Sequence, residues 1–414
     1  MIKETVSLGV KKLSLSVTNN QISAVLRSNT TKSGIRLYDN DCLGIAGAIG
    51  AYDDNELTKR AKHMLNFKLP YACLPERDKQ MSLDLSDILT ATEDEFVDMA
   101  KRVLAALSEK FPKFAFSHKI ALHETRDSIV NEQGLDLVQK DRYATFSLMY
   151  KHKDSKNLMD GGGYYIARKL CFDTIFEEMS RDCAAYDEKI DFSEQGEMIP
   201  VVTTSGYTFL MKFLMDLGAD AYANNASLFS GKMGQKLFND EFNLINNMCA
   251  KSGYERFFDG EGITFPNNSF NFIENGVLKS PRTTKRTAKQ YNLPISGSAD
   301  LGYDSAPGAG WQMEAARGAK TLKELLGGRK AILAQMAGGG DFTPQGEYAS
   351  PIQAAYMFDG EKLLGRLPQL SMSSHVNDMF GKDFIGVSSD GAYDDSPQSY
   401  MVINMNVKKI DGWL

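Results

Sequence analysis

FFDGEGITFPNNSFNFIENGVLKSPRTTKRTAKQYNLPISGSAD, residues 257–300, is the stretch in which turn, hairpin and helix signals follow one another most closely. Its Asn275-Gly276 pair stands between two apolar runs and predicts a β-hairpin, because Asn-Gly supplies the positive φ angles of a type I′ turn. An acidic loop precedes the hairpin, and a short basic helix and a Ser-Gly-Ser turn follow it. Such a loop fits either the wall of a cleft or an ordinary surface loop before a hairpin. The candidate cleft-lining residues are Asp259, Glu261, Gly262, Asn275 and Gly276.

The chain that precedes this stretch alternates between strand and helix patterns. Strict apolar–polar alternation predicts strands early in the chain, and Thr92-Glu93-Asp94-Glu95 is a capping box that predicts the start of a helix. Two further strand-like runs and a second helix, over Tyr164–Ala185, follow. The predicted strands lie at residues 13–17, 22–26, 118–122 and 143–150, with a hairpin around 39–41. This order predicts an α+β domain.

A domain boundary is predicted near residue 192. Residues 186–198 are acidic and poor in large apolar groups, and Pro200 follows them. We therefore expect an N-terminal α+β domain over 1–192 and a β-rich C-terminal domain over 193–414. The second domain is predicted to hold a helix at 207–217, a second hairpin with the same two-residue type I′ turn at Asp359-Gly360, a helix capped by Thr321 and a final strand at 400–407.

Composition excludes several classes of protein. Among 414 residues, 47 basic and 53 acidic side chains give a net charge of −6, which makes nucleic acid an unlikely partner. Five scattered cysteines without a C-x-x-C pair indicate buried thiols and a cytoplasmic protein. The most apolar segment, residues 207–217, is too short to span a membrane and is interrupted by Lys212 and Asp216, which we expect to form a surface i,i+4 pair.

No catalytic or metal-binding set is evident from the residues alone. Of the five histidines only His123 is followed by Glu, and no second histidine lies one helical turn later, as a zincin site requires. GVSSDG, residues 386–391, is one residue too long for G-x-S-x-G. The glycine-rich runs lack the Gly-Lys-Ser/Thr that cradles phosphate.

Residues 257–300 resemble the TldD/PmbA (TldE) family, the "modulator of DNA gyrase" proteins of bacteria and archaea. The family signature of Asp-Glu-Gly, Ile-Glu-x-Gly-Val-Leu, Thr-Ala and Ser/Thr-Gly-Asn appears here in the same order. Segments elsewhere in the chain also match. The matching segments are Asp259–Gly262, Ile273–Leu278, Thr287-Ala288, Ser296–Ser298, and residues 33–48, 128–134, 227–237, 339–349 and 396–407.

The resemblance implies two α+β domains and a dimer that encloses a cavity. In the TldD branch the cavity holds zinc, bound by a His-Glu-x-x-x-His helix and a cysteine near the C-terminus. The matching helix here should lie within Ser205–Asp220, which has neither His nor Glu, and the last cysteine is Cys249. The resemblance to the PmbA/TldE branch therefore implies no catalytic residue and no metal on this chain, with zinc only in a TldD-like partner.

The leading hypothesis is a non-catalytic, PmbA/TldE-like subunit of a TldD-type zinc metalloprotease that acts on unfolded peptides. Its partner would be a TldD-like subunit in a heterodimer, or a second copy in a homodimer. Two alternatives stay open. One is a self-standing peptidase with unrecognised metal ligands, and the other is a homo-oligomeric protein that binds peptides or small molecules without catalysis.

Overall fold

A computed structural model describes residues 1–193, 197–204, 207–310 and 312–410. Its strands are β1(Ile2–Thr18), β2(Gln21–Asp39), β3(Cys42–Ile49), β4(Lys79–Asp84), β5(Phe114–Asn131), β6(Leu135–His152), β7(Gly161–Ala167), β8(Glu197–Thr204), β9(Leu244–Asn247), β10(Ser269–Glu274), β11(Val277–Leu278), β12(Glu314–Ala315), β13(Ala331–Ala337), β14(Asp341–Phe342), β15(Glu347–Phe358), β16(Leu363–Arg366), β17(Leu370–His375), β18(Phe384–Gly391) and β19(Ser399–Lys409). Its helices are α1(Asp54–Met64), α2(Glu93–Lys110), α3(Phe172–Ser180), α4(Tyr207–Asp216), α5(Ala219–Ala223), α6(Ala250–Gly253), α7(Lys285–Tyr291), α8(Leu322–Leu326) and α9(Val376–Met379), with a 3-10 turn, η1(Leu65–Phe67). No helix within these residues is both long and apolar enough to cross a bilayer.

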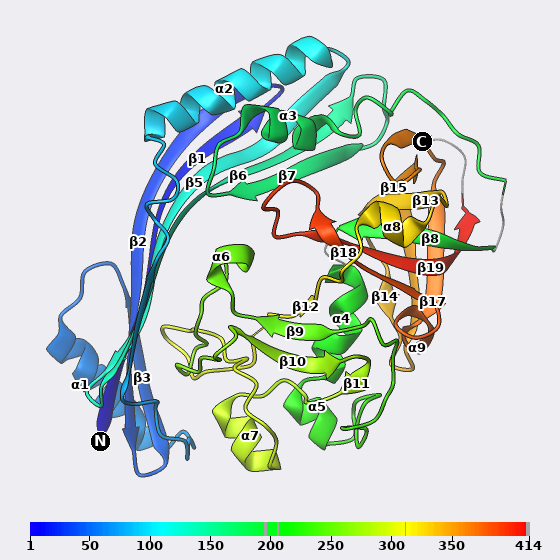
Figure 1. The fold of residues 1–414 in the computed structure, drawn as a ribbon. Helices are drawn as coiled ribbons and strands as arrows, with labels where there is room; N and C mark the ends of the chain where they lie inside the picture. Colours follow the sequence, from blue (N-terminus) through cyan, green and yellow to red (C-terminus); the bar gives the residue numbers. More distant parts are fainter. Residues whose placement is uncertain (194–196, 205–206, 311, 411–414) are drawn as a thin grey trace.

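The N-terminal part is built on a long curved sheet (Figure 1). Among the described residues its strand order is β3-β2-β1-β5-β6-β4, with β7 also paired to β6. Helix α2 lies on one face of this sheet, because its stripe of Phe96, Ala100, Val103, Leu104 and Leu107 is buried there. The Thr92–Glu95 capping box predicted from the sequence starts this helix.

Two further sheets form the C-terminal part, to the right and below in Figure 1. In the described residues one sheet has the order β13-β8-β19-β17-β15-β14, with β16 and β18 attached, and the other has the order β11-β10-β9-β12. Helix α4 contributes Phe209, Leu210 and Phe213 to a single large core shared by both sheets. The α+β class with two-domain organisation is confirmed; the boundary predicted at residue 192 lies between α3 and β8 and stays a prediction.

Two local predictions were wrong. Residues 164–185 are not one helix, because β7 occupies Gly161–Ala167 and α3 begins only at Phe172. The glycines fit tightly against β6, since a Cβ on Gly162 would lie 2.6 Å from the Leu148 carbonyl oxygen. The second hairpin exists, but Phe358 pairs with Leu363 across a four-residue loop, in which the Asp359 side chain accepts two backbone N–H groups.

The Asn275-Gly276 hairpin is confirmed. Glu274 pairs with Val277, and Asn275 and Gly276 have φ angles of 48° and 72°, as a two-residue type I′ turn requires. The glycine is needed for a second reason, because a Cβ on Gly276 would lie 2.3 Å from the Phe238 carbonyl oxygen. The turn is therefore fixed both by its φ angles and by close packing.

Candidate functional site

The acidic loop at 259–262 is held by Asp259. Its Oδ1 accepts hydrogen bonds from the backbone N–H groups of Glu261 and Ile263, each at 2.9 Å, and its Oδ2 accepts one from Ala299 at 3.0 Å. The side chain is 2% exposed. Asp259 thus shapes the loop and ties it to the segment at residue 299.

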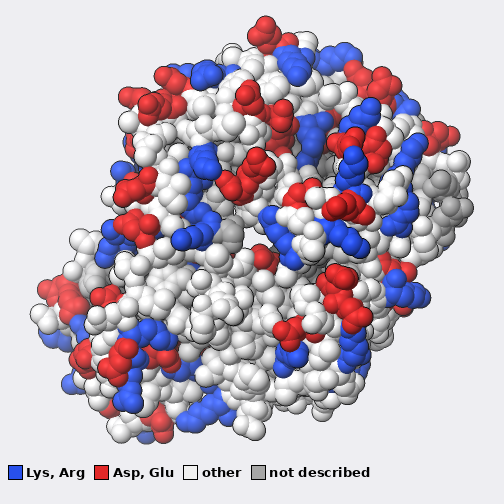
Figure 2. Space-filling model, in the orientation of Figure 1, with Lys and Arg blue, Asp and Glu red and all other residues white. Residues whose placement is uncertain are grey.

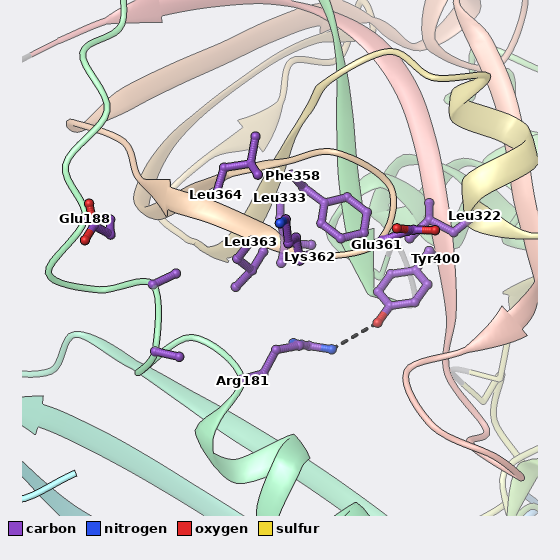
Figure 3. Close-up of a pocket in the computed structure, with 12 residues that line it drawn as sticks. Arg181, Glu188, Leu322, Leu333, Phe358, Glu361, Lys362, Leu363, Leu364 and Tyr400 are labelled. Atoms are coloured by element: carbon purple, nitrogen blue, oxygen red, sulfur yellow. Dashed lines mark hydrogen bonds between the residues drawn. The ribbon is translucent and has the colours of Figure 1, made fainter. Parts of the chain in front are cut away.

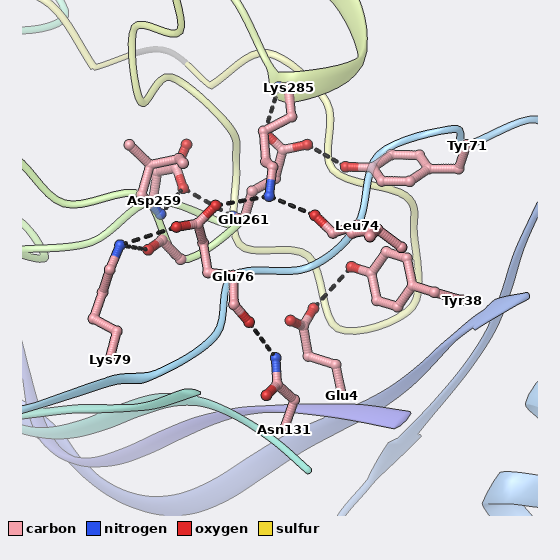
Figure 4. A network of polar contacts seen from close by, with 12 residues as sticks. Glu4, Tyr38, Tyr71, Leu74, Glu76, Lys79, Asn131, Asp259, Glu261 and Lys285 are labelled. Atoms are coloured by element: carbon pink, nitrogen blue, oxygen red, sulfur yellow. Dashed lines mark hydrogen bonds and ion pairs between the residues drawn. The ribbon is translucent and has the colours of Figure 1, made fainter. Parts of the chain in front are cut away.

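Glu261 is the centre of a buried polar network (Figure 4). Its Oε1 accepts a hydrogen bond from the Tyr71 hydroxyl, and its Oε2 accepts one from the backbone N–H of Lys285 at 2.7 Å. The Lys285 ammonium continues the network to Glu76 at 2.8 Å. Glu261 is 3% exposed, and burial together with the nearby Asp259 carboxylate raises its pKa.

Arg36 of β2 binds the same loop. Its guanidinium donates to the carbonyl oxygens of Gly260 at 2.6 Å and Gly302 at 2.9 Å, and it lies 3.3 Å from the Glu4 carboxylate. Glycine at position 260 allows the loop to lie close to the backbone at Asp300, since a Cβ there would lie 1.9 Å from the Asp300 carbonyl oxygen. Arg36 joins the long sheet to the C-terminal part of the chain.

The five residues proposed as cleft-lining do not form one group of contacting side chains. Asp259 and Glu261 are buried in the network just described, and Gly262 packs against Leu135 with a φ of +76°. The Asn275-Gly276 turn instead packs on residues 236–243, where its backbone contacts Leu237, Phe238 and Phe242. In the structure these positions hold the fold together, and their assignment to a cleft stays a prediction.

Helix α4 is the segment in which the family resemblance implies a metal site for the TldD branch. Ser205 and Gly206, the first residues of that predicted segment, lie outside the described residues. Lys212 and Asp216 pair at 2.9 Å, but the expectation of a surface pair was wrong because each side chain is only 7% exposed. Lys212 also donates to the Pro344 carbonyl at 3.1 Å, and the Asp216 Oδ2 accepts from the Leu228 N–H at 2.9 Å. Two loops that close over the helix cause this burial.

The donors on α4 do not fit zinc. Lys212 is a cation, and both Asp216 oxygens already accept hydrogen bonds, whereas zinc sites use imidazole, thiolate and available carboxylate groups. A hollow of about 140 Å³ next to the first turn of α4 is lined by neutral side chains, including Thr203, Thr208 and Gln335. Across the described parts of the chain, no group of three or more His, Cys, Asp or Glu side chains is placed to hold a metal ion.

A second hollow, of about 350 Å³, lies between the segment after α3 and the C-terminal sheet (Figure 3). Arg181 donates to the Tyr400 hydroxyl at its edge, at 2.9 Å. The guanidinium also lies 3.6 Å from Glu178 and 3.8 Å from Asp182. Burial raises the pKa of Glu178 to about 7 and that of Asp182 to about 6.

Comparison with known proteins identifies the family. A sequence profile of the PmbA/TldA metallopeptidase C-terminal domain matches residues 196–410, more than half of the chain. The chain belongs to the PmbA/TldD family. An uncharacterized protein of Methanocaldococcus jannaschii is 22% identical over 282 residues, which span 66% of this chain and 65% of that relative's length.

Solved structures share the fold over nearly the whole chain. TldE from Thermococcus kodakarensis has a TM-score of 0.81 at 16% identity, covering 98% of this chain and 96% of that chain. A proposed modulator of DNA gyrase from Thermotoga maritima has a TM-score of 0.79 at 17% identity, with the same coverage. At such identities these PmbA/TldD relatives establish a common fold and no more.

Sequence reasoning missed the partners of the acidic loop. Arg36 and Gly260 are 224 positions apart, and Tyr71 and Glu261 are 190 positions apart, so no local pattern connects them. The signal that the sequence did offer for Arg36 is its place within residues 33–48, a segment that matches the family pattern.

Proposed function

We propose that this chain is a non-catalytic, TldE-like subunit of a zinc-dependent peptidase, and that a TldD-like partner carries the metal and the catalytic residues. The observation that supports this most directly is the Lys212–Asp216 pair on α4. The helix that should hold ligands and base instead carries one ion pair, with both charges buried and engaged by the loops at 228 and 344.

Peptide hydrolysis needs an electrophile that polarises the carbonyl and a base that activates water. Lys212 and Asp216 form an ion pair with each other. The hollow beside α4 is lined by neutral side chains, among them Thr203, Thr208 and Gln335. The described surroundings of α4 therefore favour a structural role for this helix. A partner subunit would supply the missing electrophile and base.

The proposed substrate is an unfolded peptide, and the proposed setting is the cytoplasm. No disulfide joins the five cysteines in the described residues, which agrees with a reducing compartment. Figure 2 shows basic and acidic side chains interspersed on the face in view, without the continuous basic surface that nucleic acid binding favours. These features support the cytoplasmic setting and do not favour nucleic acid as a partner.

The test is reconstitution of peptidase activity. The purified chain is incubated with an unfolded peptide library alone, with a His-Glu-x-x-x-His relative from the same organism, and with that relative after Glu→Gln replacement in its motif. We expect cleavage only with the intact relative and loss of cleavage on chelation.

Two outcomes would contradict the proposal. Cleavage by this chain alone, abolished by a chelator, would show a metal site built from unrecognised ligands. Peptide binding by this chain without cleavage in any mixture would favour the binding-protein alternative.

A further inference from the structure

The hollow beside Arg181 has the size and the wall of a site for a small molecule (Figure 3). Its volume of about 350 Å³ falls within the range of ligand pockets, about 300–1,000 Å³. The wall comes from the segment after α3 and from the C-terminal sheet with α8. Most of the wall is apolar, and the large apolar side chains in it are Leu322, Leu333, Phe358, Leu363 and Leu364.

Two hydrogen-bond donors meet at one edge of this hollow. Arg181 donates to the Tyr400 hydroxyl at 2.9 Å, which is its one hydrogen bond to the described residues, although a guanidinium carries five N–H donors. The Arg181 Nε is buried without a partner in the described chain. The Tyr400 oxygen accepts from Arg181, and among the described residues no acceptor is bonded to its own proton. A guanidinium beside a hydroxyl donor suits the two oxygens of a carboxylate.

The acids next to Arg181 lie too far from it for good hydrogen bonds. The guanidinium is 3.6 Å from Glu178 and 3.8 Å from Asp182, and the Asp182 Oδ1 is buried with no partner in the described residues. Burial raises the pKa of Glu178 to about 7 and that of Asp182 to about 6. Near pH 6 the two carboxyls are therefore largely protonated, and the charge of Arg181 is only partly compensated.

No histidine is among the groups that face this cluster. Burial raises the pKa of each neighbouring phenol and of the one neighbouring thiol, so these groups stay neutral between pH 6 and pH 8; they are Tyr150 of β6, Cys183, Tyr356 of β15, Tyr393 and Tyr400 of β19. The charged side chains on the outer side of Glu178 are Lys110, Glu177 and Asp394. Those around the hollow and the tyrosines are Glu188, Glu361, Lys362, Arg366 and Asp390.

We propose that this hollow binds a small carboxylate with an apolar tail. The carboxylate accepts hydrogen bonds from Arg181 and Tyr400, and the tail lies against the leucines and Phe358. One guanidinium can neutralise one negative charge, which favours a monoanion over a phosphate dianion. A free branched-chain or aromatic acid and the C-terminal residue of a peptide share this chemistry.

The proposed site does not depend on the peptidase role. It lies on this chain alone, and no step of the argument uses a metal or a partner subunit. Reconstitution of cleavage tests the peptidase role, whereas a binding measurement on the purified chain tests the hollow. The two can therefore fail separately.

The experiment measures binding of four small probes to the full chain by saturation-transfer NMR. The two carboxylates are 4-methylpentanoate, a free acid, and N-acetyl-leucine, which mimics a peptide C-terminus. The two controls are N-acetyl-leucine amide, which lacks the charge, and 3-methylbutylamine, which has the opposite charge. We expect both carboxylates to bind at pH 6, the tighter one identifying the source, and both controls to bind at least about ten-fold more weakly.

The pH dependence is a second readout. Between pH 6 and pH 8 Glu178 loses its proton and repels the bound carboxylate. Binding of 4-methylpentanoate should therefore be at least about ten-fold weaker at pH 8 than at pH 6, because a group with a pKa of about 7 becomes about ten-fold less protonated.

Two variants locate the probes in the hollow. Tyr400→Phe removes one donor and keeps the ring, and it should weaken 4-methylpentanoate binding about ten-fold. Ala184 is exposed and lines the hollow, so Ala184→Glu should leave the melting temperature unchanged while its added charge repels the carboxylate and abolishes binding. The matched control is Ala51→Glu, at an exposed alanine in the loop between β3 and α1, which should bind like the parent.

Four results would overturn the proposal. They are no binding of either carboxylate at pH 6, binding of the amine or the amide as tight as that of the acids, equal affinity at pH 6 and pH 8, and binding unaffected by Ala184→Glu.

Discussion

Replacing Lys212 by Met removes the positive partner of the buried pair on α4. Methionine keeps most of the aliphatic length of the side chain, so the loss of packing is small. The Asp216 carboxylate, 7% exposed, keeps the hydrogen bond from the Leu228 N–H but loses its cation, and the Pro344 carbonyl loses the Lys212 donor. Removing one partner of a buried ion pair costs about 3–5 kcal/mol. We expect Lys212→Met to lower the free energy of unfolding by about 4 kcal/mol.

The assay is urea unfolding followed by far-ultraviolet circular dichroism. Lys382→Met is the matched control, because Lys382 forms an i,i+4 pair with Asp378 whose side chains are 69% and 47% exposed. That pair should contribute less than about 1 kcal/mol. The double variant Lys212→Met/Asp216→Leu should recover part of the loss, because no unpaired charge remains buried. If Lys212→Met lowers the free energy of unfolding no more than Lys382→Met does, the buried Lys212–Asp216 pair has no structural role on α4.

The other predictions concern the turn at Gly276, the buried carboxyl of Glu178 and the Arg36–Glu4 pair. Gly276→Val should destabilise the fold by about 2 kcal/mol or more, because valine there is strained by the positive φ and also collides with the Phe238 carbonyl oxygen. Gly231→Val is the control, since Gly231 has a φ of +70° but open space around it, and we expect a smaller fall in melting temperature. Burial raises the pKa of Glu178 in the folded state from its ordinary value of 4.5 to about 7. Between these pH values the folded state holds a proton that the unfolded state has lost, so the free energy of unfolding falls as the pH rises. Glu178→Gln should flatten that part of the stability curve. Arg36→Met should lower the free energy of unfolding by about 3–5 kcal/mol, because the Glu4 carboxylate stays buried without its counter-ion and keeps only the Tyr38 hydroxyl. A melting temperature equal to that of the parent would contradict this.

The sequence predicted those features whose causes are local. The Asn275-Gly276 turn and the capping boxes at Thr92 and Thr321 depend on residues at most three positions apart, and all three are present. The strand at Gly161–Ala167 was missed because glycines carry no apolar pattern, and the tight fit against β6 that selects them is visible only in three dimensions.

The candidate site was harder to predict because its character depends on distant segments. A Lys-Asp pair at i,i+4 is usually on the surface, and Lys212–Asp216 is buried only because the loops at 228 and 344 close over it. Likewise, the acidic residues at 259 and 261 suggest an open loop. Arg36 and Tyr71, which come from the N-terminal part of the chain, bury the loop by binding the Gly260 carbonyl and the Glu261 carboxylate.

Metal analysis of the purified protein decides whether this chain carries a catalytic metal. The untagged chain is loaded with zinc, washed with a chelator and measured by mass spectrometry, beside a His-Glu-x-x-x-His relative treated identically. We expect zinc far below one ion per chain here and ~1 ion per chain in the relative. Retention of ~1 zinc per chain by this protein after the chelator wash would contradict it.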